Sequence, residues 1–279
     1  MKKIFFIGGG FISEEIFNKM RKKNNYKSYF LSRLKYNLFK KKNKKFNFNN
    51  SYIFFSASKA PVKNMKMFEQ NIKILFNFFE EIKNQKIKHF IYLSSDAVYS
   101  DSKKKINENS LVMPDSLHGL MHLFREKLIE NFFKDTNLTI LRPTLVFGEK
   151  DPHNGYGPNQ FIRLAQNNKK IFLFGKGEEL RDHVSVETVA KVVDIIIKKN
   201  LKGIFNIVSG KALTFYKIVN LIKKNYKHIN FSFVKRKGPM PHKGIRVFDN
   251  RKLKKYLQTK DFLYLEDFIK MKKKYKEIS

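Results

Sequence analysis

The sequence of 279 residues contains neither cysteine nor tryptophan. The absence of cysteine excludes disulfide bonds, thiolate nucleophiles and thiolate metal sites, and it is compatible with a reducing compartment. No run of apolar residues reaches the roughly 20 that a membrane-spanning helix needs. The apolar run between Lys3 and Gly8 is too short for the core of a signal peptide. We therefore expect a cytoplasmic protein without a membrane partner.

Acidic residues are also scarce, with 24 Asp and Glu against 58 Lys and Arg, so the formal net charge is +34. A charge of this size suggests a polyanionic partner when the basic residues are clustered. Here the lysines are spread along the whole chain, with short runs only at residues 40–45 and 270–274. Abundant Lys, Asn, Phe and Ile are typical of a protein encoded by an AT-rich genome. Nucleic acid is therefore not the expected partner.

Hydrophobic patterning predicts alternating strands and helices, which is typical of an α/β protein with a doubly wound parallel sheet. The basic, poorly patterned segment 34–50 is expected to hold a reduced helix or none. We expect strands near 3–7, 28–32, 52–56, 89–94, 138–142 and 204–208, and helices near 11–23, 65–84, 116–134, 159–168, 186–199 and 214–225.

The first expected strand ends in the glycine turn Gly8-Gly-Gly-Phe-Ile-Ser13, which opens a helix. In this context a Gly-x-Gly turn presents backbone N–H groups and the positive end of a helix dipole to a pyrophosphate. Ser13 is small enough for the close packing of helix on strand that the third glycine of such a turn usually allows. The alternative is a glycine turn without a ligand.

Two later segments carry serine, aspartate and histidine side chains, which can act as catalytic groups. The segment Ile91-Tyr-Leu-Ser-Ser-Asp-Ala-Val-Tyr99 reads as a buried strand whose polar end presents Ser94, Ser95 and Asp96. The segment Pro114-Asp-Ser-Leu-His-Gly-Leu-Met-His122 reads as a turn into a helix. Its two histidines, His118 and His122, are four residues apart and therefore share one helix face.

Together with four further segments, these motifs resemble the extended short-chain dehydrogenase/reductase family, which comprises sugar-nucleotide epimerases, dehydratases and reductases. The resemblance runs in order from residue 3 to about residue 210. In that family the strand ends in a catalytic Ser or Thr, matched here by Ser95, and the helix carries Tyr-x-x-x-Lys. His118 and His122 stand at the Tyr and Lys positions. The further segments are 71–79, Leu141-Arg-Pro-Thr-Leu-Val-Phe-Gly148, Arg181-Asp-His-Val-Ser-Val-Glu-Thr-Val-Ala190 and Phe205-Asn-Ile-Val-Ser-Gly210.

The resemblance implies an NAD(P)-dependent enzyme with Ser95, His118 and His122 as catalytic residues. Histidine suits acid–base work, because its ordinary pKa near 6.5 needs no adjustment by a neighbouring lysine. One alternative is that Tyr99 or another nearby aromatic residue has taken over the proton transfer. Another is a dinucleotide-binding protein of the same fold without catalysis. Two histidines four apart can also hold zinc, but no third ligand is evident, so no metal site is expected.

The resemblance also implies a dinucleotide and a nucleotide-activated sugar as ligands, in a pathway of cell-surface polysaccharide synthesis. Ser32 and Arg33 end the second expected strand, where a carboxylate would select NAD, so NADP is favoured over NAD. The expected cofactor-binding residues are Gly8, Gly10, Phe11, Ile12, Ser32, Arg33, Ser56, Ala57 and Pro143. The expected substrate-binding residues are Asp96, Asn154, Arg181 and Arg236, the arginines because a guanidinium fork matches phosphate oxygens.

By the same resemblance, residues 1–147 would form the dinucleotide-binding domain, to which the strand near 204–208 returns. Residues 148–279 would mainly form a substrate-binding lobe. The helices near 65–84 and 116–134 carry apolar stripes and match those that pair across a homodimer in the family. The alternative is that these stripes pack onto the sheet. The apolar residues concerned are Ile72, Leu75, Phe76, Phe79, Leu120, Leu123, Phe124 and Leu128.

Overall fold

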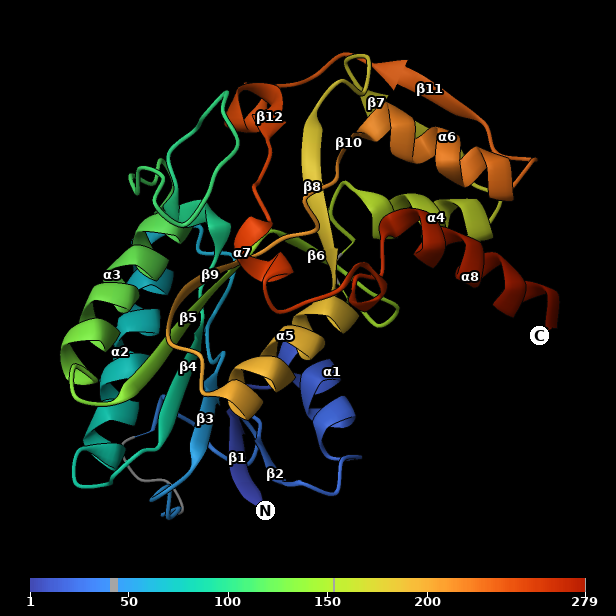
Figure 1. Cartoon of the computed structure of the whole chain (residues 1–279). Coiled ribbons are helices and arrows are strands. Elements are labelled where there is room, and N and C mark those ends of the chain that lie inside the picture. Colours follow the sequence, from blue (N-terminus) through green and yellow to red (C-terminus); the bar gives the residue numbers. More distant parts are fainter. Residues whose placement is uncertain (41–44, 153, 279) are drawn as a thin grey trace. The chain divides into compact units, whose positions relative to one another are not determined.

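The computed structural model describes residues 1–40, 45–152 and 154–278, and the chain forms two compact units (Figure 1). Unit 1 comprises Met1–Ser100, Glu108–Pro143 and Val189–Ile207. Unit 2 comprises Asp101–Asn107, Thr144–Thr188 and Val208–Ser279.

Unit 1 is built on a parallel sheet of six strands in the order β2-β1-β3-β4-β5-β9. The expected doubly wound parallel sheet is thus confirmed. Each of the six expected strands is present. Their bounds are β1 (Lys2–Ile7), β2 (Tyr26–Leu31), β3 (Tyr52–Phe55), β4 (His89–Leu93), β5 (Asn137–Pro143) and β9 (Gly203–Ile207).

Helices cover both faces of this sheet, because alternate side chains of each strand point to opposite faces. Figure 1 shows α2 (Met65–Ile82) and α3 (Leu117–Phe132) on one face, and α1 (Phe11–Met20) and α5 (Val186–Lys199) on the other. The α2 and α3 face holds a continuous core with strand residues from β1, β3, β4 and β5. That core includes Phe5, Ile7, Ile53, Phe55, Phe90, Tyr92, Leu75, Phe78, Phe79 and Ile129.

The segment between β2 and β3 contributes side chains to this core instead of a helix. Residues 34–40 and 45–50 contain turns and extended chain in the described structure. Tyr36, Leu38 and Phe48 are buried in the core. For these residues the expected loss of a helix is confirmed, while residues 41–44 lie outside the described part of the chain.

The order of the strands reverses at β1, which has β2 on one side and β3 on the other. In open α/β sheets, ligands bind at such a reversal, outside the carboxyl ends of the strands. The glycine turn follows β1 at this edge, and Ser56 follows β3 at the same edge.

Unit 2 has a small mixed sheet and a separate pair of strands. In the sheet, β8 (Leu180–Ser185) pairs with β6 (Leu145–Phe147), β10 (Ala212–Thr214) and β12 (Ile245–Arg246). Strands β7 (Ile171–Phe174) and β11 (Phe231–Val234) form the pair. The helices and helical turns are α4 (Pro158–Gln166), α6 (Phe215–Asn225), η2 (Pro241–Gly244), α7 (Arg251–Lys254), η3 (Thr259–Asp261) and α8 (Leu265–Ile278).

Candidate active site

The glycine turn after β1 is packed tightly against the turns after β2 and β3. Gly8 has φ +118°, and a Cβ there would lie 2.7 Å from both Ala57 N and Ser56 Oγ, so only glycine fits. A Cβ on Gly9 would lie 3.0 Å from Ser32 Cβ. The structure therefore brings the expected cofactor-binding residues of three strand ends together.

Gly10 differs from the other two glycines of the turn, because a Cβ there would meet no atom within 4 Å. Gly10 is the N-cap of α1, with no side-chain hydrogen bond to the first turn of the helix. Phe11 and Ile12 begin that turn, where backbone N–H groups lack intrahelical partners. The open space beside Gly10, at the N-terminus of this helix, fits a phosphate group.

The remaining expected cofactor-binding residues lie at strand ends of unit 1. The exposed Arg33 places its guanidinium over the Phe39 ring, 4.9 Å from the ring centroid. Ser56 Oγ donates a hydrogen bond to Ile7 O at 3.2 Å, which ties the turn after β3 to β1. Pro143 is the buried last residue of β5.

Ser95 and His118 belong to two elements that are in direct contact. Ser95 is the N-cap of the short helix η1 (Asp96–Val98), and its Oγ accepts a hydrogen bond from Ala97 N at 3.2 Å. Gly119, which follows His118, packs so closely on η1 that a Cβ there would lie 2.1 Å from Ala97 O. Glycine at position 119 thus allows α3 to begin beside the Ser95 turn.

The two histidines form a neutral pair. Their rings lie 4.7 Å apart, centroid to centroid, at 89°, and His122 Nδ1 lies 2.7 Å from the Tyr92 hydroxyl. Burial lowers the pKa of His118 from its ordinary value, against an opposing effect of Asp96. Burial, His118 and Arg125 hold the pKa of His122 well below its ordinary value. At neutral pH neither ring is therefore expected to carry a charge.

Glu126, one turn beyond His122, anchors the polar end of β4. Its carboxylate accepts hydrogen bonds from Arg142 Nη2 at 2.6 Å, Arg142 Nε at 3.0 Å and Ser94 Oγ at 2.5 Å. Glu126 and Arg142 are both almost completely buried. The pair holds α3 to the ends of β4 and β5, the strands beneath the Ser95 turn.

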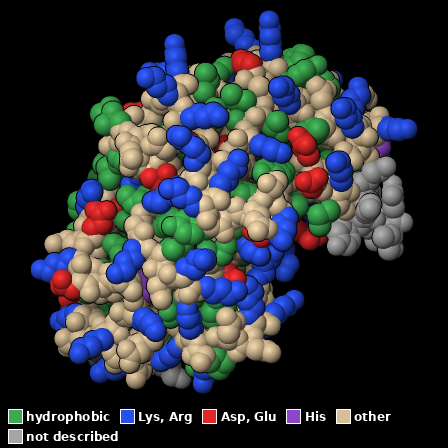
Figure 2. Space-filling view, in the orientation of Figure 1, with side chains coloured by type: hydrophobic (Ala, Val, Ile, Leu, Met, Phe, Trp, Pro, Cys, Tyr) green, Lys and Arg blue, Asp and Glu red, His purple; other side chains and the backbone are tan. Residues whose placement is uncertain are grey.

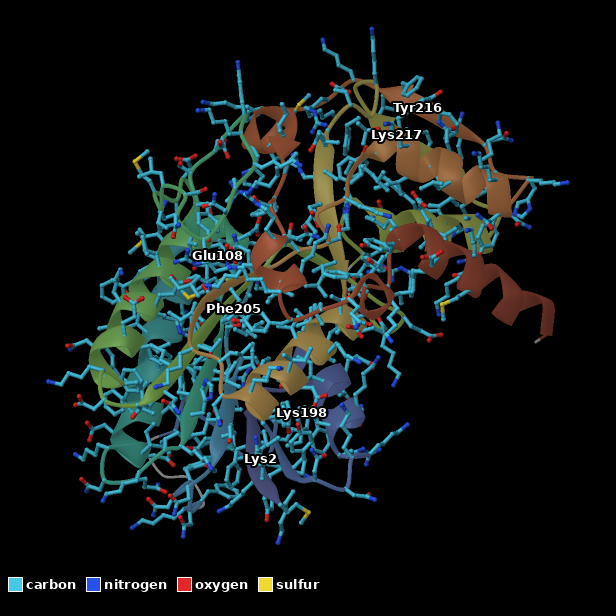
Figure 3. All side chains as sticks on the ribbon, in the orientation of Figure 1. Lys2, Glu108, Lys198, Phe205, Tyr216 and Lys217 are labelled. Atoms are coloured by element: carbon cyan, nitrogen blue, oxygen red, sulfur yellow. The ribbon has the colours of Figure 1, made fainter. Side chains whose placement is uncertain are left out.

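Tyr99 belongs to this structural network. Its hydroxyl donates to Asn206 Oδ1 at 2.7 Å, and the Arg142 guanidinium lies 4.8 Å from its ring centroid. Asn206 in turn donates its backbone N–H to Glu108 Oε1 at 3.0 Å; Figure 3 labels Glu108 and the adjacent Phe205. Burial raises the pKa of Tyr99, which makes it a poorer proton acceptor at neutral pH.

In unit 2, the two expected phosphate-binding arginines share one carboxylate. Arg181 Nη2 donates to Glu179 Oε2 at 2.6 Å and to Pro241 O at 2.6 Å. Arg236 donates to the other oxygen of Glu179, and its guanidinium lies 5.5 Å from the Phe174 ring centroid. Glu179 therefore lies where the two guanidinium groups converge.

The other two expected substrate-binding residues have separate surroundings. Asn154 is exposed in unit 2, and its Oδ1 accepts a hydrogen bond from Arg163 Nε at 3.2 Å. Asp96 belongs to unit 1, in η1 beside the histidine pair.

Sequence reasoning missed several residues of these sites, namely Tyr92, Gly119, Arg125, Glu126 and Glu179. The spacing of Arg125 and Glu126 from His118 and His122 offered one signal, because all four fall on or beside one helix face. The contacts of Tyr92 and Glu179 depend on the tertiary structure and leave no local pattern.

The described residues contain no cluster of three or more His, Cys, Asp or Glu side chains suited to a metal ion. None of the described helices has the length and apolar character to cross a membrane. Lys and Arg side chains are dispersed over the visible face of the protein in Figure 2, and no single basic patch stands out there.

Two comparisons with known sequences identify relatives of this chain. Residues 56–208 match the model of the NAD dependent epimerase/dehydratase family. A dTDP-D-glucose 4,6-dehydratase of Dictyostelium discoideum is 29% identical over 160 residues, which cover 52% of this chain and 37% of that protein. The chain spans less than half the length of the curated relatives that it matches first.

Solved structures share the fold at low sequence identity. A UDP-N-acetylglucosamine 4-epimerase from Methanobrevibacter ruminantium M1, in complex with UDP-N-acetylmuramic acid, has a TM-score of 0.83 and 20% identity, covering 100% of this chain and 99% of that one. A UDP-glucuronic acid 4-epimerase from Bacillus cereus, solved with NAD, has a TM-score of 0.81 and 19% identity, covering 99% of each chain.

Proposed function

This chain belongs to the NAD dependent epimerase/dehydratase family, and from that premise we propose that it is an NAD(P)-dependent enzyme acting on a nucleotide-activated sugar. The reaction would be an epimerisation, a dehydration or a reduction. The observation that carries the proposal is the open space at Gly10, in front of the first turn of α1 and at the reversal of the strand order.

The residues around the glycine turn fit a dinucleotide. Gly10, Phe11 and Ile12 would bind the pyrophosphate through the helix N-terminus, and Ser56 and Ala57 would lie beside it. Arg33 would face the adenosine ribose, and NADP is favoured because the residues after β2 offer a cation and no carboxylate there. When bound, the nicotinamide would supply the hydride acceptor or donor of the reaction.

His118 would be the acid–base group at the substrate, with Ser95 as the hydroxyl that binds the reacting oxygen. A neutral imidazole can accept a proton from a substrate hydroxyl and later return it. His118 and His122 replace the Tyr-x-x-x-Lys pair of the family, and the neutral His122 would contribute position rather than charge. Tyr99 is the weaker candidate, because its hydroxyl is held by Asn206 and burial raises its pKa.

Unit 2 would bind the nucleotide-sugar. Arg181 and Arg236 converge on one carboxylate, a geometry that equally suits the oxygens of a diphosphate. Such a ligand would have to displace Glu179 from the two arginines. We propose residues 1–147 as the dinucleotide-binding region and residues 148–279 as mainly the substrate-binding region. Within its own unit, Asp96 would lie beside His118, and Asn154 would contribute to the sugar contacts of unit 2.

A homodimer through α2 and α3 is part of the proposal. Leu75 and Phe79 of the apolar stripes are buried in the core of unit 1. In contrast, Phe76 is 48%, Leu120 44% and Phe124 45% exposed, so these rings and chains are available to a second copy. Light scattering should give the mass of a dimer at micromolar concentration, and Phe124→Asp should give a monomer.

One observation favours a second function, a dinucleotide-binding protein without catalysis. Histidines stand at the catalytic tyrosine and lysine positions, and burial lowers the pKa of both, so position 122 is not expected to supply a cation. Turnover of any nucleotide-sugar by the purified protein would exclude this alternative.

Calorimetric titration with NADP and NAD tests the proposed cofactor site. Because a Cβ at Gly10 meets open space and φ is −82°, Gly10→Ala and Gly10→Val should fold normally. Gly10→Val should abolish binding, and Gly10→Ala should weaken it less, because the side chains would occupy the space of the phosphate. Unchanged affinity in Gly10→Val would remove the cofactor assignment.

A further inference from the structure

Arg125 is a buried cation that the proposed function does not use. It lies on the inner face of α3, seven residues after His118 and three after His122, and its side chain is fully buried. A buried charge is costly to a fold unless it is paired, and an apolar side chain of similar volume would usually be as stable or more stable there. Its presence therefore calls for a role beyond packing.

The guanidinium is held by aromatic rings and a carbonyl group. It lies 5.2 Å from the ring centroids of both Phe55 and Tyr92, and Nη2 donates to Ala57 O at 3.0 Å. Nη1 lies 3.9 Å from Met121 Sδ, and Nε has no hydrogen-bond partner. In the described part of the chain no carboxylate forms an ion pair with it, since Glu126 is bound to Arg142 and Ser94.

A continuous set of contacts leads from this cation to the proposed acid–base group. The guanidinium stacks on Tyr92, the Tyr92 hydroxyl lies 2.7 Å from His122 Nδ1, and the His122 ring meets the His118 ring at 4.7 Å. Burial raises the pKa of Tyr92, so it remains a phenol that can donate its proton to Nδ1. A donor at Nδ1 would leave the ring proton of neutral His122 on Nε2.

We propose that Arg125 is a positioning residue of this site: it fixes Tyr92 and, through the Tyr92–His122 hydrogen bond, keeps the two histidine rings oriented so that His118 can accept a proton. The cation that is missing at position 122 is thus present one turn further along α3. Because no carboxylate in the described part of the chain forms an ion pair with it, its charge acts on the nearby rings, at Tyr92 against an opposing effect of Glu126.

The groups that face the histidine pair agree with this role. Burial, then the His118 ring and Arg125, disfavour a proton on His122. Asp96 of η1 favours a proton on His118, and the Val62 N–H donates a long hydrogen bond of 3.5 Å to His118 Nδ1. Glu126 is neutralised by Arg142. Asp96 therefore acts on the His118 ring and Arg125 on the His122 ring.

The test is an NMR titration of the histidine rings in the full-length protein, with signals assigned through His118→Gln and His122→Gln. In Arg125→Met, the titration midpoint of His122 should rise, by roughly one pH unit, whereas that of His118, which is shifted by burial and Asp96, should change less. In Arg125→Lys the low midpoints should largely persist. Arg21→Met is the matched control, because Arg21 also stacks on a ring, Phe17 at 5.7 Å, but is exposed. It should leave both midpoints unchanged.

Tyr92→Phe keeps the ring and the cation but removes the hydroxyl. The ring nitrogen shifts of His122 should then lose the single Nε2–H tautomer that the wild type is expected to show. An unchanged titration midpoint of His122 in Arg125→Met, or an unchanged His122 tautomer in Tyr92→Phe, would overturn the inference.

The significance for catalysis rests on the proposed function, but the titration needs no cofactor. Failure of the wild type to bind NADP and NAD would therefore contradict the proposed function and leave the titration result intact. If Arg125→Met does not fold, the His122 tautomer in Tyr92→Phe, compared with that in the wild type, still tests the inference.

Discussion

Arg125 of unit 1 and the arginine pair at Glu179 in unit 2 have opposite kinds of surroundings. In unit 1, Arg125 lies between two aromatic rings and forms no ion pair with any described residue. In unit 2, Arg181 and Arg236 share the carboxylate of Glu179. A cation without an ion-paired carboxylate shifts the pKa values of neighbouring groups permanently. Cations that are paired with a carboxylate can bind an anionic ligand only when that carboxylate is displaced. We infer that the first arrangement suits a site that tunes side chains, and the second suits a site that binds an anion.

The largest expected effect concerns the group that Arg125 is proposed to serve. His118→Ala should lower turnover of the nucleotide-sugar by roughly 10²–10⁴, because it removes the acid–base group. Since burial lowers the pKa of His118 and a proton acceptor must be neutral, activity should fall with decreasing pH below about 6.5. Steady-state rates measured from pH 5 to 8 check both points. A wild-type rate in His118→Ala would exclude His118 as the acid–base group and make Tyr99 the next candidate.

The second prediction contrasts the paired arginine of unit 1 with the unpaired one. Glu126→Leu leaves Arg142 buried without its carboxylate and should lower the free energy of unfolding by about 3–5 kcal/mol. Arg125→Met removes a buried charge that forms no ion pair with any described residue, so it should be neutral or stabilising. Urea denaturation of the two variants measures the difference. Equal destabilisation by both would mean that Arg125 is compensated by something other than its rings.

The fold of unit 1 could be predicted because each of its strands and helices has a local pattern of apolar and polar residues. Buried strands such as β1 and β4 are short apolar runs, and the glycine turn marks the start of α1. Unit 2 was less readable, because strand β8 is made largely of polar residues that are buried by tertiary contacts: Arg181, Asp182, His183 and Ser185. A polar buried strand has no alternation that a sequence pattern could detect.

The sites were predictable in part for the same reason. Gly8, Ser95 and His118 lie within contiguous motifs, so their neighbourhood could be expected from the sequence. The contact of Gly119 with Ala97 O and the bridge of Glu179 between two arginines join segments that are distant along the chain. No local pattern encodes such contacts.

The third prediction tests whether Glu179 acts as a displaceable counter-ion in unit 2. Glu179→Gln keeps the shape of the side chain but removes the negative charge that competes with a ligand for Arg181 and Arg236. Calorimetric titration with inorganic pyrophosphate should therefore show affinity increased by about tenfold, which corresponds to 1.4 kcal/mol. Arg181→Gln should weaken binding.

Glu178→Gln is the matched control, since Glu178 is the exposed neighbour and accepts a hydrogen bond from Lys176 N at 2.7 Å. It should leave the affinity for pyrophosphate unchanged. If Arg181→Gln weakens binding while Glu179→Gln has no effect, the arginines bind the anion but Glu179 does not compete with it. If neither variant matters, pyrophosphate binds elsewhere.

The smallest expected effect concerns His183, a buried histidine of unit 2. Burial and Arg181 lower the pKa of His183 to about 3, and its Nε2 is buried without a hydrogen-bond partner. Below about pH 6.5 the unfolded chain binds a proton at this histidine and the folded protein does not, so stability falls as pH falls. His183→Phe should remove this contribution, about 1 kcal/mol between pH 6.5 and 5.5. Urea denaturation at the two pH values should show a smaller loss of stability in the variant than in the wild type. An equal loss in both would mean that the proton uptake on unfolding occurs at other histidines, such as the neutral pair beside Arg125 in unit 1.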